Sequence, residues 1–235
     1  MNNCFHQVLN RMKTLVPNKQ NSKILIACSA GADSMFLTFV LKTLNYNVDV
    51  LHITHDMRPT SETDKDRDAV FALCNAIGVA VTHRHVYGKH MTGNIESNYR
   101  ELRYQLFKQV ATENGCNFVA TGHNADDQLE TILMNLSRGC GIKGLRGIAV
   151  SRNLDDSTDI KVIRPLIDLT KAKIYNQCHD YGIGYCEDIT NQDDTMTRNN
   201  IRKNVLPVLK AMFPKCAEKS VKLGEKMASI KDDGE

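Results

Sequence analysis

The stretch Ile24-Leu25-Ile26-Ala27-Cys28-Ser29-Ala30-Gly31-Ala32-Asp33-Ser34 decides the fold of this 235-residue chain. Its apolar first half predicts a strand over residues 24–28, and the small residues that follow predict a tight turn. Apolar side chains between Met35 and Leu44 then predict a helix over residues 34–45. A strand–turn–helix junction directs backbone N–H groups and a helix N-terminus at one point, which suits a phosphate group.

The turn lacks two common nucleotide-binding signatures. It contains neither a G-x-x-x-x-G-K-S/T pattern nor a G-x-G-x-x-G pattern. An acidic residue, Asp33, in a phosphate loop without lysine favours a pyrophosphate bound through a metal ion, and Asp33 is the candidate metal ligand. The alternative is a tight strand-to-helix turn that binds nothing.

Strands and helices alternate along the rest of the chain. We expect further strands over residues 48–54, 79–86, 117–121 and 161–164, helices over 62–77, 96–114 and 126–137, and a loop over 138–160. This alternation predicts an α/β fold with a doubly wound, mostly parallel sheet and helices on both faces. Ligands bind at the carboxyl ends of such strands, so residues 29–34, 52–58 and 121–127 should share one rim.

Three regions are expected: an N-terminal helix within residues 1–20, the α/β domain over 21–168, and a small helical extension over 169–235. The extension is basic, because residues 198–231 hold nine Lys/Arg and two Asp/Glu, whereas the whole chain carries a net charge of +3. On charge alone a solvated helix face is the commoner explanation, and nucleic acid is the partner that such a basic stretch would suit.

Composition points to a cytoplasmic protein with no membrane segment. The eight cysteines form no C-x-x-C pair, which is typical of free thiols in a reducing compartment. No apolar run approaches the roughly 20 residues that span a bilayer. The N-terminus lacks the apolar core of a secretory signal.

Two polar clusters have simple structural interpretations when taken alone. His52 and His55 have the spacing of zinc ligands, but residues three apart on a strand point to different faces, and no cysteine pair completes a site. Arg100 and Arg103 would lie on a solvated helix face. The order of these two clusters along the chain, together with five further motifs, favours a more specific interpretation.

These clusters together resemble the tRNA(Ile)-lysidine synthetases, within the wider PP-loop family of N-type ATP pyrophosphatases. The family loop S-G-G-x-D-S is similar to Ser29–Ser34, and the run G-H-N-x-D-D-Q-x-E-T matches Gly122–Thr131 at every fixed position. Other segments resemble the family's motifs: His52–Pro59, with Met57 in a Leu place, Asn94–Tyr104, Arg138–Leu145, Arg164–Leu166 and Glu187–Arg202. The resemblance covers about residues 20–213.

The resemblance implies a two-step reaction. ATP adenylates the 2-carbonyl oxygen of the wobble cytidine of tRNA(Ile) with a CAU anticodon and releases pyrophosphate. The ε-amine of free L-lysine then displaces AMP and leaves lysidine. ATP and Mg²⁺ are therefore the implied cofactors, and tRNA(Ile) and free lysine are the implied partners.

The resemblance also implies roles for residues. Those for ATP are Ser29, Ala30, Gly31, Ala32, Asp33, Ser34, His52, Arg58 and Gly122. The catalytic set is Asp33 on the metal, Arg103 and His123 on the phosphate-bearing intermediate, and Asp127 and Glu130 on lysine. Asp127 and Glu130 lie three apart at the start of one helix, so they share a face, although Asp126 or Asp127 is also a candidate helix cap. The tRNA set is Arg138, Arg198, Asn199, Arg202 and Lys203.

The chain departs from the family pattern at two points. Ala30 replaces the first loop glycine and would cost roughly 1 kcal/mol if the position needs a positive φ. Family members usually continue into C-terminal domains that grip the tRNA, so the basic stretch 198–226 and a homodimer would have to supply more of the affinity.

Three alternative functions remain at this stage. A related PP-loop enzyme could add sulfur to tRNA, but such relatives typically use cysteine pairs, and neither Cys140 nor Cys186 belongs to one. A small-molecule ATP pyrophosphatase, such as an amide or NAD synthetase, would not need the basic extension. A non-catalytic ATP- and tRNA-binding relative would tolerate Ala30.

Overall fold

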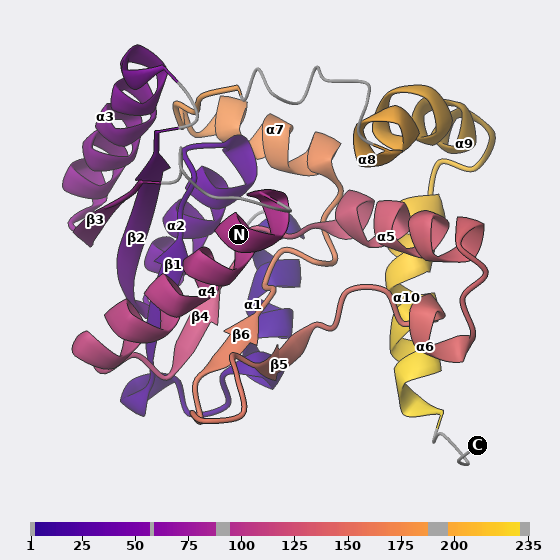
Figure 1. The fold of residues 1–235 in the computed structure, drawn as a ribbon, viewed down its shortest axis with the longest axis horizontal. Helices are drawn as coiled ribbons and strands as arrows, with labels where there is room; N and C mark the ends of the chain where they lie inside the picture. The colour runs from indigo at the N-terminus through magenta and orange to yellow at the C-terminus, as the bar shows by residue number, and fades with distance from the viewer. Residues whose placement is uncertain (1–2, 57–58, 88–94, 188–196, 231–235) are drawn as a thin grey trace.

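A six-stranded sheet organises the protein. The computed structural model describes residues 3–56, 59–87, 95–187 and 197–230 (Figure 1). The strands are β1 (Lys23–Ala27), β2 (Asn47–His55), β3 (Ala80–Val86), β4 (Phe118–Ala120), β5 (Ser151–Asn153) and β6 (Lys161–Ile163). Their spatial order is β3-β2-β1-β4-β6-β5, with only the β5–β6 pair antiparallel. The predicted doubly wound, mostly parallel sheet is confirmed.

Helices cover both faces of this sheet. The α-helices are α1 (Asn3–Leu15), α2 (Ala32–Thr43), α3 (Thr60–Ile77), α4 (Ile95–Glu113), α5 (Ala125–Ser137), α6 (Ile142–Leu145), α7 (Lys171–Asp180), α8 (Thr197–Asn200), α9 (Leu206–Met212) and α10 (Cys216–Ser229). A 3-10 turn spans Lys19–Asn21, and a π-helical turn spans Ile201–Val205.

Alternation along β1 assigns side chains to the two faces. Ile24 and Ile26 belong to the larger core with α1, α2, α3 and α7, whereas Leu25 belongs to the core beneath α4. Side chains alternate between faces because successive residues of a strand point in opposite directions. In Figure 1, α4 crosses in front of the strands while α1 and α2 lie behind them.

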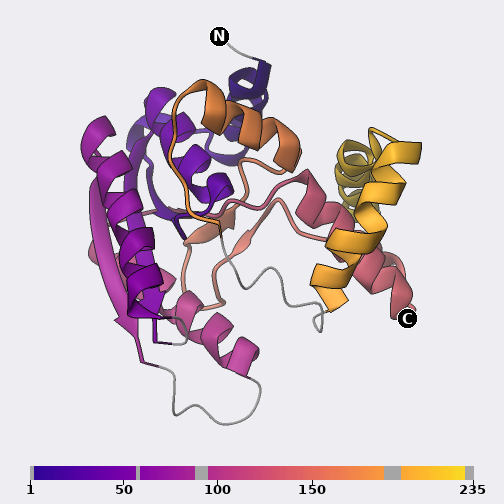
Figure 2. The same ribbon diagram turned by 90° about the horizontal axis from the view of Figure 1, so that it is seen from above.

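A helical lobe adjoins the sheet domain on the side away from α3 and β3 (Figure 2). Helices α5, α9 and α10 form it around a small core that includes Leu129, Leu206 and Val221. On α1, Arg11 donates to Asp168 at 2.7 Å and to Glu225 of α10 at 2.7 Å, so one side chain links three parts of the chain. The boundary at residue 168 stays a prediction.

The expected loop over residues 138–160 is wrong in part. This segment contains α6 and the edge strand β5, which pairs with β6 through Arg152 and its two neighbours. Both elements are short, and β5 has no buried residue, so neither has an apolar periodicity that a sequence could reveal.

Two further observations concern the cysteines and the helices. All eight cysteines are free thiols. Among the described residues, no helix combines the length and apolarity that crossing a membrane requires.

Candidate active site

The candidate site lies where the sheet changes direction. From β1 the chain winds to β2 and β3 on one side, and β4 and β6 lie on the other. The carboxyl ends of β1 and β4 are adjacent, because Ile26 pairs with Ala120. A crevice at such a switch point is where doubly wound sheets bind ligands. The structure therefore brings the predicted turn after Cys28 and the polar run after Ala120 to one place.

The turn after β1 forms the predicted phosphate-binding loop. The Ser34 hydroxyl accepts the Ser29 N–H at 3.1 Å and donates to the Gly31 carbonyl at 3.0 Å, which closes the turn. Helix α2 begins at Ala32 after Gly31, whose position has no side-chain cap. The first N–H groups of α2 therefore suit an anion, as expected for a phosphate.

Ala30 adopts the left-handed conformation that its glycine counterpart would adopt easily. Its φ is 68°, and the residue is fully buried. Its carbonyl oxygen accepts the Cys186 N–H at 3.0 Å, which ties the loop to the segment after α7. Because position 30 does have a positive φ, this alanine carries a backbone strain of about 1–2 kcal/mol.

The polar run after β4 contacts the phosphate loop directly. A Cβ atom at Gly122 would lie 3.1 Å from the backbone of Asp33 and Ser34, so only glycine fits without a shift. Asn124 donates from its side chain to Asp33 Oδ1 at 3.0 Å, and its backbone N–H donates to Asp127 Oδ2 at 3.0 Å. One asparagine thus links the two predicted catalytic carboxylates.

The environment of the Asp33 carboxylate favours the binding of a divalent cation. Burial, followed by the nearby Asp127 carboxylate, raises the pKa of Asp33 to about 6. Burial and the neighbouring negative charge both disfavour the ionised carboxylate, and a bound cation would offset both effects. Oxygen ligands of this kind, completed by phosphate oxygens, are typical of Mg²⁺.

Asn124, rather than Asp126 or Asp127, is the N-cap of α5. Its side chain accepts the N–H groups of both aspartates, and Asp127 completes a capping box by accepting the Asn124 N–H. Asp126 instead accepts the N–H of Lys171 at 2.7 Å, at the start of α7, and pairs with Lys210. Capping therefore uses one oxygen of Asp127 and leaves the other available for a ligand or an ion pair.

Two arginines from the extension lie against the predicted lysine-binding pair. Glu130 Oε1 accepts from Arg202 Nε at 2.8 Å, and Oε2 accepts from Arg198 Nε and Arg202 Nη2 at 2.9 Å. Asp127 Oδ1 accepts from Arg198 Nη2 at 3.3 Å. The Glu130 side chain is 1% exposed and that of Asp127 is 17% exposed, so Asp127 is the more accessible carboxylate.

The five residues predicted to bind tRNA differ in exposure and in their partners. Arg138 and Lys203 are exposed, Asn199 is buried, and Arg198 and Arg202 hold the carboxylates of α5. Sequence reasoning missed this pairing. A signal was present, because two acids spaced i,i+3 and two arginines spaced i,i+4 on separate helices are complementary.

His52 contacts the backbone just before the phosphate loop. Its Nδ1 lies 2.8 Å from the carbonyl oxygen of Cys28, the residue before the phosphate loop, and the ring is buried. Burial lowers the pKa of His52, so the neutral ring donates to that carbonyl. Arg58, predicted with it for ATP, lies outside the described residues.

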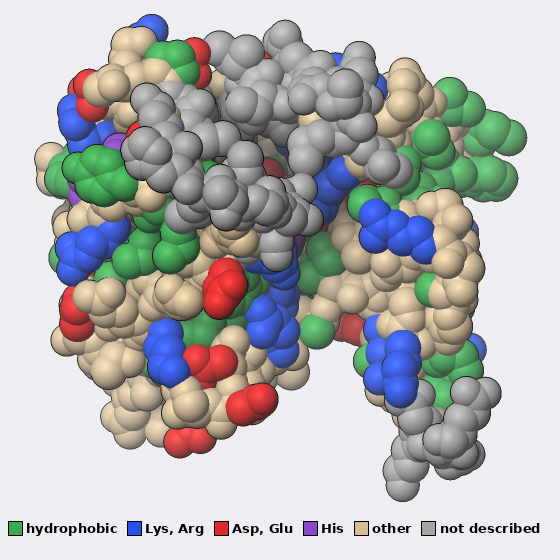
Figure 3. Space-filling view, in the orientation of Figure 1, with side chains coloured by type: hydrophobic (Ala, Val, Ile, Leu, Met, Phe, Trp, Pro, Cys, Tyr) green, Lys and Arg blue, Asp and Glu red, His purple; other side chains and the backbone are tan. Residues whose placement is uncertain are grey.

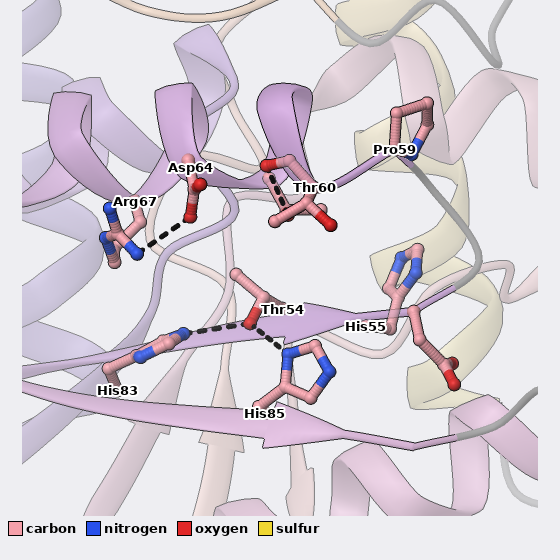
Figure 4. Close-up of a pocket in the computed structure, with 10 residues that line it drawn as sticks. Thr54, His55, Pro59, Thr60, Asp64, Arg67, His83 and His85 are labelled. Atoms are coloured by element: carbon pink, nitrogen blue, oxygen red, sulfur yellow. Dashed lines mark hydrogen bonds and ion pairs between the residues drawn. The ribbon is translucent and has the colours of Figure 1, made fainter.

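A separate pocket of about 520 Å³ lies beside His52, between β2, β3 and α3 (Figure 4). The rings of His83 and His85 both point to the Thr54 hydroxyl, at 2.8 and 2.9 Å. No group of three or more metal-ligating side chains occurs in the described parts of the chain.

His123 follows Gly122 on the same rim. Its Nδ1 lies 2.9 Å from the Thr121 hydroxyl. Burial, and then the charges of Arg164 and Arg198 among others, lower the pKa of His123 to about 3. Arg103 lies on α4, where desolvation of its guanidinium, followed by the charge of Arg100, lowers its pKa.

The low pKa of His123 predicts a loss of stability in mild acid. The unfolded chain binds a proton below pH 6.5, whereas the folded chain cannot bind it until about pH 3. Between pH 6.5 and 5.5 the free energy of unfolding should fall by about 1 kcal/mol from this residue alone. Urea unfolding at both pH values should show a smaller fall for His123→Asn, and an equal fall would contradict the assignment.

The comparisons agree with the fold and the loop. The family model of the PP-loop domain matches residues 5–209, so the chain belongs to the PP-loop family. Curated tRNA(Ile)-lysidine synthases resemble it: the Porphyromonas gingivalis protein is 34% identical over 231 residues, which cover 94% of this chain and 49% of that protein. The Bacillus subtilis synthase is 33% identical over 88% of this chain and 46% of its own length. The chain thus spans about half the length of the curated relatives it matches.

Solved structures share the architecture. A tRNA thiolase from Methanococcus maripaludis superposes with a TM-score of 0.76 at 19% identity, covering 99% of this chain and 82% of that one. An NMN synthetase from Francisella tularensis gives a TM-score of 0.58 at 11% identity, covering 97% and 95%. At these identities the likeness concerns the fold alone.

Proposed function

We propose that this chain carries the catalytic centre of a tRNA(Ile)-lysidine synthase, which acts in the cytoplasm on the wobble cytidine of tRNA(Ile) with a CAU anticodon. The observation that carries the proposal is Asn124, which holds Asp33 beside the phosphate loop and Asp127 beside the start of α5. A pyrophosphate-releasing group and an amine-binding group thus adjoin on one rim. The similarity to curated lysidine synthases supports the same reaction.

In the proposed first step, the N–H groups of the loop Ser29–Gly31 and of the α2 N-terminus hold the ATP phosphates. Asp33 would hold Mg²⁺, which neutralises charge on the leaving pyrophosphate. The cytidine 2-oxygen attacks the α-phosphorus, and the bond to pyrophosphate breaks. Arg103 and His123 lie on the side of the rim where the adenylated base would bind.

In the proposed second step, Asp127 binds the ammonium group of lysine and accepts its proton. The neutral amine forms a bond to carbon 2, and the bond from that carbon to oxygen breaks, so AMP leaves with the electron pair. Glu130 is too buried to meet the substrate without movement of the arginines. We assign it to positioning Arg198 and Arg202 around Asp127.

The proposed tRNA surface is the exposed basic part of the lobe. Arg138 at the end of α5 and Lys203 before α9 are exposed, and the Arg198 side chain is 41% exposed despite its ion pairs. A homodimer would double this surface.

Mass spectrometry of tRNA(Ile) with a CAU anticodon tests the proposal. After incubation with protein, ATP, Mg²⁺ and lysine, the wobble cytidine should gain the mass of one lysine less one water. Asp33→Asn is the matched control and should leave the base unmodified while the fold persists. Sulfur-dependent turnover without lysine would overturn the proposal, as would an unmodified base with protein that is folded and binds ATP.

A further inference from the structure

Four arginines gather on the rim beside His123. Arg100 and Arg103 extend from α4, Arg152 lies on β5, and Arg164 follows β6. The guanidiniums of Arg100 and Arg152 lie 5.3 and 4.8 Å from the centre of the Tyr104 ring. Figure 3 shows Lys and Arg side chains along a hollow between the sheet domain and the helical lobe.

In the part of the chain that the structure describes, this group of arginines has no balancing negative charge. Among the described residues, no Asp or Glu forms an ion pair with any of the four arginines. Arg152 donates instead to the carbonyl oxygens of Asn153 and Leu154, at 2.8 and 3.3 Å. Arg164 donates to the Ala149 carbonyl. Backbone carbonyls position these guanidiniums but do not neutralise them.

Arg164 is the most informative member of the group. It is 4% exposed, and its buried Nε–H has no hydrogen-bond partner in the described structure. Burying the Arg164 guanidinium without a counter-charge and with an unused N–H donor costs folding free energy. Its closeness to the positive charges of Arg100 and Arg152 adds to that cost. Burial and these neighbours also lower the pKa of Arg164. A protein retains such an arrangement most readily where a bound anion offsets it.

We propose that Arg100, Arg152 and Arg164 form a second phosphate-binding site, separate from the loop at Ser29–Ser34. The planar guanidinium matches phosphate oxygens with paired N–H donors. Packing on the Tyr104 ring orients two of the guanidiniums without using a charge. The phosphate is either a backbone phosphodiester of bound RNA or a phosphate of ATP, and the two sources can be separated by experiment.

The test uses the double variant Arg100→Gln/Arg152→Gln, because both residues are less buried than Arg164 and the fold should tolerate their loss. Arg84→Gln on β3 is the matched control, since Arg84 is paired with Glu113 away from the rim. A labelled anticodon stem-loop RNA is titrated by fluorescence anisotropy over a series of KCl concentrations. MgATP is titrated separately by calorimetry. Thermal unfolding confirms that each variant is folded.

If RNA is the source, the double variant should bind the stem-loop about tenfold more weakly, and the slope of log K against log salt should become shallower by about 1–2. MgATP affinity should not change. If ATP is the source, MgATP affinity should fall about tenfold and RNA affinity should stay. Unchanged affinity for both ligands would overturn the proposal. Neither measurement needs lysidine formation, so failure of the proposed function would be seen separately.

Discussion

Replacing Glu130 by Gln should both destabilise the helical lobe and stop lysine-dependent release of AMP. The buried carboxylate accepts three charged hydrogen bonds from Arg198 and Arg202, and a neutral amide leaves both guanidiniums without their main partner. Breaking a buried ion pair costs about 3–5 kcal/mol, but these arginine side chains are 41% and 28% exposed, so we expect about 2 kcal/mol. The melting temperature should fall by about 4–8 °C.

Asp168→Asn provides the control for stability. Asp168 accepts two hydrogen bonds of 2.7 Å from Arg11, so its loss also breaks a two-pronged ion pair, but one that involves neither Arg198 nor Arg202. This variant should lose melting temperature without losing lysine-dependent AMP release. If Glu130→Gln keeps full AMP release after its melting temperature has fallen, Glu130 does not position the arginines for catalysis.

Substitutions at Ala30 should separate backbone strain from packing in the phosphate loop. Ala30→Val places a β-branched residue at a φ of 68° in a fully buried position. Both the strained backbone and the added volume are unfavourable, so we expect a loss of about 3 kcal/mol or more and at least tenfold weaker ATP binding. Ala30→Gly relieves about 1–2 kcal/mol of strain, against about 0.4–1 kcal/mol of added chain entropy in the unfolded state.

Ala30→Gly should therefore bind ATP at least as tightly as the parent protein, with an equal or higher melting temperature. Ala32→Gly is the matched control, because Ala32 is the first residue of α2 and has no positive φ. The same chemical change there should lower stability by about 0.5–1 kcal/mol. Calorimetric titration with MgATP and thermal unfolding measure both. Weaker ATP binding by Ala30→Gly would show that the methyl group has a role of its own.

Most of the strands and long helices were predictable because they bury an apolar face with a regular period. The run Ile24–Cys28 and the helix expected over residues 62–77 are close to β1 and α3. The exceptions are α6 and β5, because short exposed elements depend on their neighbours for stability. The sequence predicted strain at Ala30 only if its φ is positive, and the structure shows that φ is 68°.

The sequence by itself determined the turn at Ser29–Ser34, the order of the strands along the chain, and the polar run Gly122–Thr131 that we propose as part of the active site, since all three depend on residues close together in the chain. Only the tertiary structure decided that Arg198 and Arg202 pair with Glu130, about 70 positions away, and that Arg100 and Arg152 both pack on the Tyr104 ring. Such contacts depend on how α4, β5, β6 and the extension pack against one another. Charge pairs between residues far apart in the sequence are therefore visible only in the assembled fold, where burial sets how strongly the charges interact.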